Sequence, residues 1–325
     1  MTWVIGVDSG GSGLRVALAD ATDPARTESV SSREPVRTGP SGIEAAHLLE
    51  QLLPMAGELL GRAGDVQVSA VAIGAAGMAT LGDDLRAVLP AALESSLGAP
   101  RLALAADAVT AYAGALGQRP GAVVAAGTGM IALGTDLTRW ARADGWGHLL
   151  GDCGGGAWIG RAGLEAAMRA HDGRSGGSAA LLHRLEAVFG PAAGLPGQLY
   201  PRTDRPAVLA SFAPEVARCA GTDPVASAIL REAARQIVDT AAAVCPPAEE
   251  GPCQVALTGG LFRMGDPLLV PARQEFARRL PHVRAIPAAG DPLVGAVLIA
   301  AELAGGTLRL PHHPQLLRLT VGQGT

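Results

Sequence analysis

The first third of the chain alternates short apolar runs with longer segments whose apolar residues recur every three or four positions. The opening "WVIGVDSGGSGLRVALAD" predicts a strand, a tight glycine turn and a second strand. We expect a third extended piece near residues 29–37. Helical spacing follows in "GIEAAHLLEQLLPMAGELLGRAG", with a bend or restart at Pro54, and in "GDDLRAVLPAALESSLG". Buried strands are predicted in "VQVSAVAIGAAGM" and "RLALAAD", and a helix begins at Asp107, which gives the order βββαβαβα.

A second strand–turn–strand pattern, "GAVVAAGTGMIALGTD", begins about 115 residues after the first and indicates a duplicated architecture. The chain is then largely helical as far as "CQVALTGGLF", a strand and a glycine turn that leads into a helix. The segment "HVRAIPAAGDPLVGAVLIAAEL" predicts a short strand, a turn and a last apolar helix. The pattern therefore favours an α/β protein.

Composition limits the chemistry. A length of 325 residues suits two domains, and cores built from 48% hydrophobic but only 3% aromatic residues must be aliphatic. The chain contains no lysine. This excludes a P-loop, which places a lysine on the phosphates, and Schiff-base catalysis through a lysine.

Charge and cysteine usage bear on partners and location. The net charge is −4, without a basic stripe for nucleic acid. There is no signal-peptide pattern and no apolar run long enough to cross a membrane, so we expect a cytoplasmic protein with no membrane or nucleic-acid partner. The four cysteines, Cys153, Cys219, Cys245 and Cys253, form no CxxC pair, so a metal or iron–sulfur site is not expected.

Three glycine turns are candidate nucleotide-binding elements. In "DSGGSG" the backbone N–H groups of Gly10 and Gly11 can cradle phosphate oxygens, Ser12 adds a hydroxyl donor, and Asp8 can hold Mg²⁺ through water. The alternative is an ordinary hairpin with a glycine-rich tip. "AAGTGM" repeats this logic, and "LTGGLF" would let a flat ring lie against backbone. The second and third turns supply these candidates: Gly127, Thr128, Gly129, Gly259 and Gly260.

Asp107, in "AADAVTAY", directly follows an apolar strand. A carboxylate in this position can accept a proton from a substrate hydroxyl. The alternative is a helix N-cap, a common position for aspartate, and both roles can coexist.

Together these motifs resemble the actin-like ATPase superfamily of sugar kinases, Hsp70 and actin. The resemblance is strongest to its N-acetylglucosamine kinase and BadF/BadG/BcrA/BcrD group, because "GWGHLLGDCGGGAWIG" is similar to that group's "GGWG…GDEGS.YWI" pattern. It implies two ribonuclease H-like α/β domains with the active site in the cleft between them. The small domain would be residues 1–112 with a returning helix at about 291–310, and the large one residues 113–290. Members are commonly homodimers.

The resemblance also implies roles for individual residues. Asp8 would attend Mg²⁺, the first two glycine turns would hold the ATP phosphates, and Gly259 and Gly260 would bind adenosine. Asp107 would be the base that activates a sugar 6-hydroxyl. The sugar site would be lined by Gly145, Trp146, Gly147, His148 and Asp152, although His148 could instead orient Asp152. Arg15 could reach a phosphate, but an exposed strand arginine is the expectation.

Two departures from the group's pattern bear on the sugar. Cys153 stands where relatives carry a glutamate, and the loop 37–42 lacks the asparagine of N-acetylglucosamine kinases. Because actinobacterial members include glucosamine kinases and the composition suits such an origin, glucosamine is the expected substrate and N-acetylglucosamine the alternative. Three further classes of protein share this scaffold: an iron–sulfur ATPase activase, a non-catalytic sugar sensor and a zinc-bearing sugar kinase. The cysteine pattern or the presence of Asp107 and both phosphate turns disfavours each of them.

Overall fold

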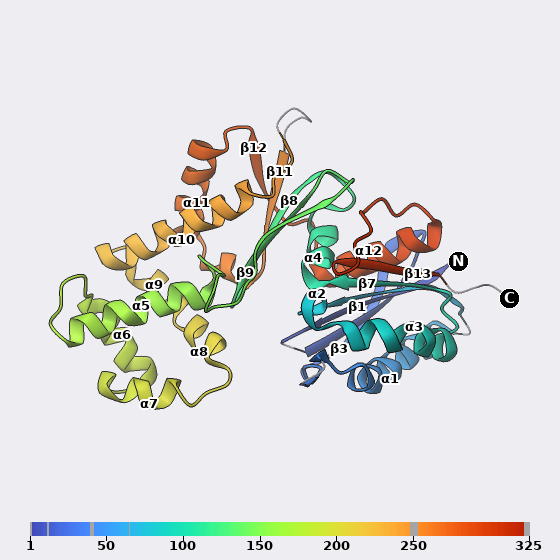
Figure 1. The fold of residues 1–325 in the computed structure, drawn as a ribbon, viewed down its shortest axis with the longest axis horizontal. Helices are drawn as coiled ribbons and strands as arrows, with labels where there is room; N and C mark the ends of the chain where they lie inside the picture. The colour runs from blue at the N-terminus through green and yellow to red at the C-terminus, as the bar shows by residue number, and fades with distance from the viewer. Residues whose placement is uncertain (1, 12, 40–41, 65, 248–252, 322–325) are drawn as a thin grey trace. The chain divides into compact units, whose positions relative to one another are not determined.

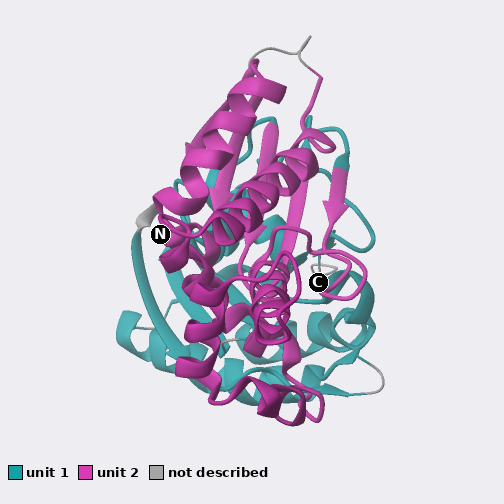
Figure 2. Ribbon diagram, turned by 90° about the vertical axis from the view of Figure 1, so that its left-hand side faces the viewer, with its two compact units in different colours: residues 1–120, 135–140, 288–325 teal, residues 121–134, 141–287 magenta. Residues whose placement is uncertain are grey.

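The computed structural model describes residues 2–11, 13–39, 42–64, 66–247 and 253–321, arranged in two compact units (Figures 1 and 2). Unit 1 comprises residues 1–120, 135–140 and 288–325, and unit 2 comprises residues 121–134 and 141–287. The predicted domain boundary after residue 112 falls inside a helix, Asp107–Leu116, whose last turn belongs to unit 1. Unit 1 also holds Trp140, whose ring meets Tyr112 edge-on at 5.3 Å and whose Nε1 donates to the Pro311 carbonyl.

Unit 1 is built on a six-stranded mixed sheet in the order β13-β7-β6-β1-β2-β3. The strands β1, β6 and β7 run parallel, and the hairpin partners β2 and β3 and the edge strand β13 run antiparallel to their neighbours. The strands of this unit are β1 (Trp3–Gly10), β2 (Gly13–Asp20), β3 (Asp23–Ser32), the short pair β4 (Thr38–Gly39) and β5 (Gly42–Ile43), β6 (Val68–Ala75), β7 (Arg101–Ala106) and β13 (Leu317–Val321).

The helices of unit 1 are α1 (Ala45–Ala63), α2 (Met78–Leu81), α3 (Asp83–Leu97), α4 (Asp107–Leu116) and α12 (Pro292–Gly305). Helix α12, the predicted returning helix, lies against both β1 and α4. Its apolar residues are distributed around the whole helix, as expected for a helix buried on several sides. Val297, Ile299 and Leu303 are accordingly buried.

Unit 2 has a five-stranded sheet in the order β10-β9-β8-β11-β12 and a helical half (Figure 1). Its strands are β8 (Gly121–Ala126), β9 (Met130–Thr135), β10 (Trp140–Asp144), β11 (Cys253–Thr258) and β12 (Val283–Pro287), although the end residues Thr135 and Trp140 fall in unit 1. Its helices are α5 (Gly156–His171), α6 (Ala179–Phe189), η1 (Ala192–Gly194), α7 (Leu195–Leu199), α8 (Arg205–Ser211), α9 (Ala213–Cys219), α10 (Pro224–Ala242), η3 (Gly260–Met264) and α11 (Asp266–Arg279). Aliphatic side chains dominate the core, with Phe212 among the few buried aromatic rings.

The predicted βββαβαβα order of unit 1 is confirmed, with local differences. The third strand covers Asp23–Ser32 instead of residues 29–37, because it pairs with β2 from its first residue to its last. Helix α1 continues through Pro54, which is exposed on the solvent side. The strand β13 had no counterpart in the prediction. None of the helices in the described ranges has the length and apolar character needed to cross a bilayer.

Candidate active site

In unit 1 the predicted metal residue, Asp8, and the predicted base, Asp107, lie at the same end of the sheet, where β1 and β7 reach their carboxyl ends. The parallel register places Asp8 beside Gly74 of β6, and Gly74 beside Ala105 of β7. Asp107 follows two residues after Ala105. Because neighbouring strands are about 4.8 Å apart, β1 and β7 are separated by about 10 Å across β6. That spacing leaves room for a phosphate chain on one side and a hydroxyl acceptor on the other.

Asp107 is exposed at the first position of α4, and Ala106 holds the N-cap position. The N–H of Ala108 donates to its Oδ1 at 2.8 Å, so the carboxylate binds a backbone amide without occupying the cap itself. The positive end of the helix dipole favours a negative charge at this position. The location suits a proton acceptor that is open to solvent.

Arg15 joins two carboxylates of unit 1. Its guanidinium donates twice to Asp8 Oδ2, at 3.0 and 2.7 Å, and once to Asp291 Oδ2, at 2.5 Å. The expectation of an exposed strand arginine was therefore incomplete. A signal for this contact was present in the sequence: the predicted β1–β2 hairpin, in which Gly10 pairs with Gly13, places Asp8 and Arg15 opposite each other.

The pKa values of the two carboxylates are shifted in opposite directions. Burial raises the pKa of Asp8 and outweighs the hydrogen bond from Arg15. Burial also acts on Asp291, but the N–H of Val294 at the start of α12 and the Arg15 guanidinium lower its pKa overall. Arg15 holds the two carboxylates close together. Because Mg²⁺ takes one or two carboxylates together with substrate phosphates, Asp8 and Asp291 are a donor set that fits it.

In unit 2 the predicted second phosphate turn is fastened to the start of α5. The carbonyl of Gly127 accepts from Gly156 N, and the carbonyl of Thr128 accepts from Ala157 N, both at 2.8 Å. The parallel pairing of β8 and β11 brings the third glycine turn to the same sheet edge, because Thr258 lies beside Ala125. The turns at 127–129 and 259–260 are therefore neighbours.

The glycines of the three turns fall into two groups. At Gly10, Gly11, Gly127 and Gly260, a Cβ would meet no atom within 4 Å. Gly259, in contrast, has φ +104°, and its Cβ would lie 2.2 Å from the Ala126 carbonyl oxygen. Packing thus explains Gly259, and Gly129 belongs to the same group, because a Cβ there would lie 2.3 Å from Asp152 Oδ2. At the other four positions the space above the backbone is open, as close approach of a ligand requires.

The loop 144–155 is organised by two aspartates in left-handed conformation, Asp144 at φ 60° and Asp152 at φ 56°. Asp144 accepts from the N–H groups of Asp152 and Cys153, at 2.6 and 3.0 Å. Asp152 accepts from Gly147 N at 3.0 Å and from the N–H of Met130. A left-handed non-glycine residue costs about 1–2 kcal/mol, and these hydrogen bonds offset that cost. Sequence reasoning missed Asp144, although it directly precedes the recognised "GWG".

Asp152 also touches the phosphate turn, because a Cβ on Gly129 would lie 2.3 Å from its Oδ2. Burial raises its pKa, as does the nearby Asp144. Its carboxylate is thus engaged by the loop and the turn, and sugar contact by Asp152 stays a prediction. Gly145 and Gly147 both adopt positive φ.

The tip of this loop is apolar and open. Trp146 is 65% exposed, and the Arg142 guanidinium stacks on its ring at 4.6 Å. Leu149 and Leu150 are exposed as well. His148 is half-buried, and it lies close enough to Asp152 to act against the rise in the pKa of that carboxyl. The Cys153 thiol has a raised pKa because of burial, which keeps it protonated at neutral pH.

Two predicted features lie outside these observations. Ser12 lies outside the described residues, as does the centre of the loop 37–42. In the ranges that the structure describes, no three His, Cys, Asp or Glu side chains are grouped as a metal site.

Known proteins match nearly the whole chain. The model of the BadF/BadG/BcrA/BcrD ATPase family matches residues 5–300. An N-acetylmuramic acid/N-acetylglucosamine kinase of Clostridium acetobutylicum is 30% identical over 92% of this chain and 98% of its own. Among solved structures, a Chromobacterium violaceum protein to which N-acetylglucosamine kinase activity is ascribed is 28% identical, with TM-score 0.68, over 92% of this chain and 98% of that one.

A glucokinase of the ROK family from Streptomyces griseus is 22% identical over 94% of this chain and 100% of its own, with TM-score 0.54, and shares the fold. These similarities confirm the expected two-domain actin-like ATPase fold and the expected class of enzyme, an ATP-dependent sugar kinase. The chain belongs to the BadF/BadG/BcrA/BcrD ATPase family.

Proposed function

We propose that this enzyme transfers the γ-phosphoryl group of ATP to the 6-hydroxyl of an amino sugar, with N-acetylglucosamine as the substrate that has the most support. The carrying observation is the strand register that sets Asp107 at the same sheet edge as Asp8 and the glycine turn at 10–11. A base and a phosphate turn about 10 Å apart leave space between them for a hydroxyl and a γ-phosphoryl group in line.

In the proposed step Asp107 accepts the proton of the sugar 6-hydroxyl. The sugar oxygen forms a bond to the γ-phosphorus, the bond from that phosphorus to the β–γ bridging oxygen breaks, and ADP leaves. Phosphoryl transfer depends chiefly on positioning and charge neutralisation. The exposed carboxylate is positioned for this role by the start of α4, where it accepts from a backbone amide.

The nucleotide would be held by backbone. The open glycines at 10, 11 and 127, with Ser12, Thr128 and Gly129, would face the phosphates, and Gly260 the adenosine, with Gly259 shaping that turn. Asp8, with Asp291 beside it, would hold Mg²⁺, which when bound neutralises charge on the phosphates. Arg15 then keeps both carboxylates in place.

For the sugar, support comes from the relatives and from the 144–155 loop. The Clostridium relative is named for N-acetylmuramic acid and N-acetylglucosamine, both of which carry an acetamido group. This loop packs against the second phosphate turn and contains all the predicted sugar residues: Gly145, Trp146, Gly147, His148 and Asp152. Because Asp152 contacts Gly129 of that turn, it would fix the position of a bound sugar relative to the nucleotide phosphates.

Glucosamine, expected from the sequence, remains the second candidate. It is favoured by the composition, which suits the actinobacterial members that include glucosamine kinases, while the departures at Cys153 and the loop 37–42 leave the identity of the sugar open. A protonated 2-amino group would need carboxylate or carbonyl acceptors. The neutral Cys153 thiol supplies no negative charge, so this candidate is the weaker one.

A substrate panel tests the proposal. We expect kcat/KM for N-acetylglucosamine to exceed that for glucosamine and glucose at least tenfold, which corresponds to about 1.4 kcal/mol of transition-state discrimination. ADP release would be measured in a coupled assay and the phosphorylated product identified by mass spectrometry. A tenfold preference for glucosamine would replace the first candidate with the second, and no sugar-stimulated ADP release would end the kinase proposal for these sugars.

The same panel run on Asp107→Asn tests the base. We expect kcat to fall at least a hundredfold with the affinity for sugar largely retained, because general-base catalysis contributes about 10²–10⁴ in rate. Asp83→Asn is the matched control, since Asp83 is also an acidic residue at the first position of a helix in unit 1. Near-normal turnover by Asp107→Asn would remove Asp107 from the mechanism.

The family resemblance further leads us to propose a homodimer, and the cytoplasmic location expected from the sequence stays a proposal. Sedimentation velocity would then give twice the 32.7 kDa mass of one chain, and a monomer at micromolar concentration would contradict the dimer.

A further inference from the structure

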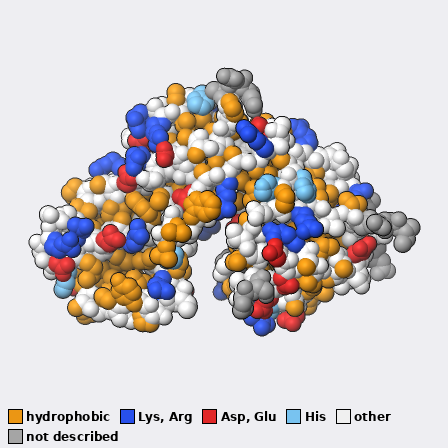
Figure 3. Space-filling view, viewed as in Figure 1, with side chains coloured by type: hydrophobic (Ala, Val, Ile, Leu, Met, Phe, Trp, Pro, Cys, Tyr) orange, Lys and Arg blue, Asp and Glu red, His pale blue; other side chains and the backbone are white. Residues whose placement is uncertain are grey.

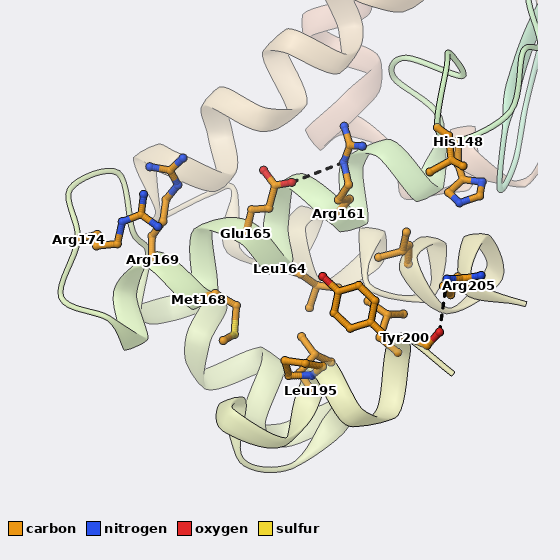
Figure 4. A pocket seen from close by; sticks show the side chains of 14 residues that line it. His148, Arg161, Leu164, Glu165, Met168, Arg169, Arg174, Leu195, Tyr200 and Arg205 are labelled. Atoms are coloured by element: carbon orange, nitrogen blue, oxygen red, sulfur yellow. Dashed lines mark hydrogen bonds and ion pairs between the residues drawn. The ribbon is translucent and has the colours of Figure 1, made fainter. Parts of the chain in front are cut away.

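Unit 2 contains a cavity of about 620 Å³, and the kinase proposal uses only His148 from its lining (Figure 4). It lies along α5 and is bordered by α7, α8 and the tip of the 144–155 loop. Pockets for small organic ligands have volumes of about 300–1,000 Å³, so this one is of ligand size. Its lining residues all belong to unit 2.

The floor of the cavity is apolar. Leu164 of α5, Leu195 of α7 and Leu209 of α8 are buried beneath it, and Met168 and Leu199 complete the surface. Tyr200, 73% exposed, stands over this floor with its ring toward the cavity (Figure 4). In the space-filling view, apolar side chains gather over the helical half of unit 2, with arginines around them (Figure 3).

The rim is strongly basic. Arg161, Arg169, Arg174 and Arg205 line the cavity, against a single acidic residue, Glu165. Glu165 is already paired with Arg161 at 3.6 Å, and Arg205 donates to the Tyr200 carbonyl. Arg169 and Arg174 stand next to each other at one end (Figure 4), and neither guanidinium has a hydrogen bond or ion pair with any residue in the described part of the chain.

We propose that this cavity binds an amphipathic organic anion, with a carboxylate or phosphate head on Arg169 and Arg174 and an apolar body on the leucine floor. Two adjacent, unpaired guanidiniums are suited to bidentate binding of such a head group. Arg161 and Arg169 are eight residues apart on α5, or about 12 Å at 1.5 Å per residue, so an apolar body of about eight to ten carbons matches the floor.

Octyl phosphate, sodium octanoate and the neutral 1-octanol, titrated calorimetrically into the full-length protein without ATP or sugar, test the proposal. We expect both anions to bind at least tenfold more tightly than 1-octanol, and their relative affinities identify the preferred head. Because no kinase substrate is present, the result is independent of the proposed activity. Equal affinities for the anions and the alcohol, or no binding by any of them, would overturn the proposal.

The double variant Arg169→Gln/Arg174→Gln locates the head group. We expect it to lose at least tenfold in affinity for both anions while its affinity for 1-octanol is unchanged. Arg231→Gln/Arg235→Gln, on the exposed face of α10 and outside the cavity lining, is the matched control and should bind like the wild type. Leu199→Trp, which fills the floor, should weaken all three ligands, and unchanged circular dichroism would show that this loss does not come from unfolding. Undiminished anion binding by the Arg169/Arg174 variant would refute the assignment.

Discussion

Asp8 is subject to two opposing effects at the scale of single residues. Burial on β1 favours the protonated carboxyl, while the Arg15 guanidinium favours the carboxylate that a magnesium site requires. Arg15 also holds Asp291, the N-cap of α12, and so ties the β1–β2 hairpin to the returning helix. One arginine therefore opposes the effect of burial on the pKa of the proposed metal ligand and also holds that ligand in position.

Replacing Arg15 with glutamine removes the cation that lowers the pKa of Asp8, so that pKa should rise further. If ionised Asp8 is needed for Mg²⁺, the acid limb of the kcat/KM profile should move to higher pH, with activity better retained in the alkaline range. A pH–rate series with saturating ATP measures this. Arg33→Gln, an exposed arginine of the same unit, should leave the limb in place. A uniform loss of activity at every pH would show that Arg15 has a purely structural role.

The raised pKa of Asp8 also predicts how the stability of the protein depends on pH. A carboxyl whose pKa is raised by folding binds more protons in the native state than in the unfolded chain. Asp8 and Asp152 therefore both make the free energy of unfolding fall as pH rises from the ordinary aspartate range through their raised native pKa values. A site built on buried carboxylates thus gives up some stability at neutral pH, in keeping with their use for binding.

At the scale of elements, the site of unit 2 depends on one bracing arrangement. The start of α5 holds the turn 127–129 through two backbone hydrogen bonds, and Asp152 lies against Gly129 and accepts from Met130. Asp144 in turn holds the amides of Asp152 and Cys153. Movement of the loop 144–155 would therefore displace the phosphate turn 127–129.

The adjacent glycines 259 and 260 provide a matched pair of variants. Gly259→Ala forces a side chain into a positive-φ position 2.2 Å from the Ala126 carbonyl, so it should lower the free energy of unfolding by about 2–4 kcal/mol. Gly260→Ala meets open space and should leave stability within about 0.5 kcal/mol while weakening ATP binding. Urea unfolding and nucleotide titration separate the two effects. Equal stabilities for the two variants would contradict the packing argument.

At the scale of the whole molecule, each unit has its own sheet and its own buried aliphatic core. The residues proposed to bind ATP come from both units: Asp8 and the turn at 10–11 from unit 1, and the turns at 127–129 and 259–260 from unit 2. A ligand that binds only the native chain stabilises it by mass action.

We expect a non-hydrolysable ATP analogue with Mg²⁺, at a hundred times its Kd, to stabilise the protein by about 2.7 kcal/mol. Differential scanning calorimetry measures this as a raised Tm. With EDTA in place of Mg²⁺ the shift should shrink, since the Asp8–Asp291 pair then has no divalent cation to bridge to the phosphates. The same shift in EDTA would argue against a metal site at Asp8.

Local pattern determined much of this protein. Strand and helix periods, together with glycine turns that follow strands, were enough to predict the βββαβαβα order and an α/β protein, and the resemblance to the actin-like ATPase superfamily supplied the two-domain fold. Asp107 was located for the same reason, because a residue that directly follows a parallel strand must lie at the carboxyl edge of its sheet. Similarity to known proteins then supported the class of enzyme.

Only the tertiary structure decided contacts between residues distant in sequence. The Arg15–Asp291 ion pair spans 276 positions, and β13 joins β7 after a tail with weak strand pattern. Asp152, predicted to face the sugar, is seen to brace the phosphate turn, because its carboxylate packs on a glycine 23 residues earlier. The cavity with Arg169 and Arg174 was invisible in the sequence, since its walls come from three helices and a loop. Periodicity in the sequence predicts whether a side chain faces the core or the solvent, whereas tertiary packing decides which residues it contacts.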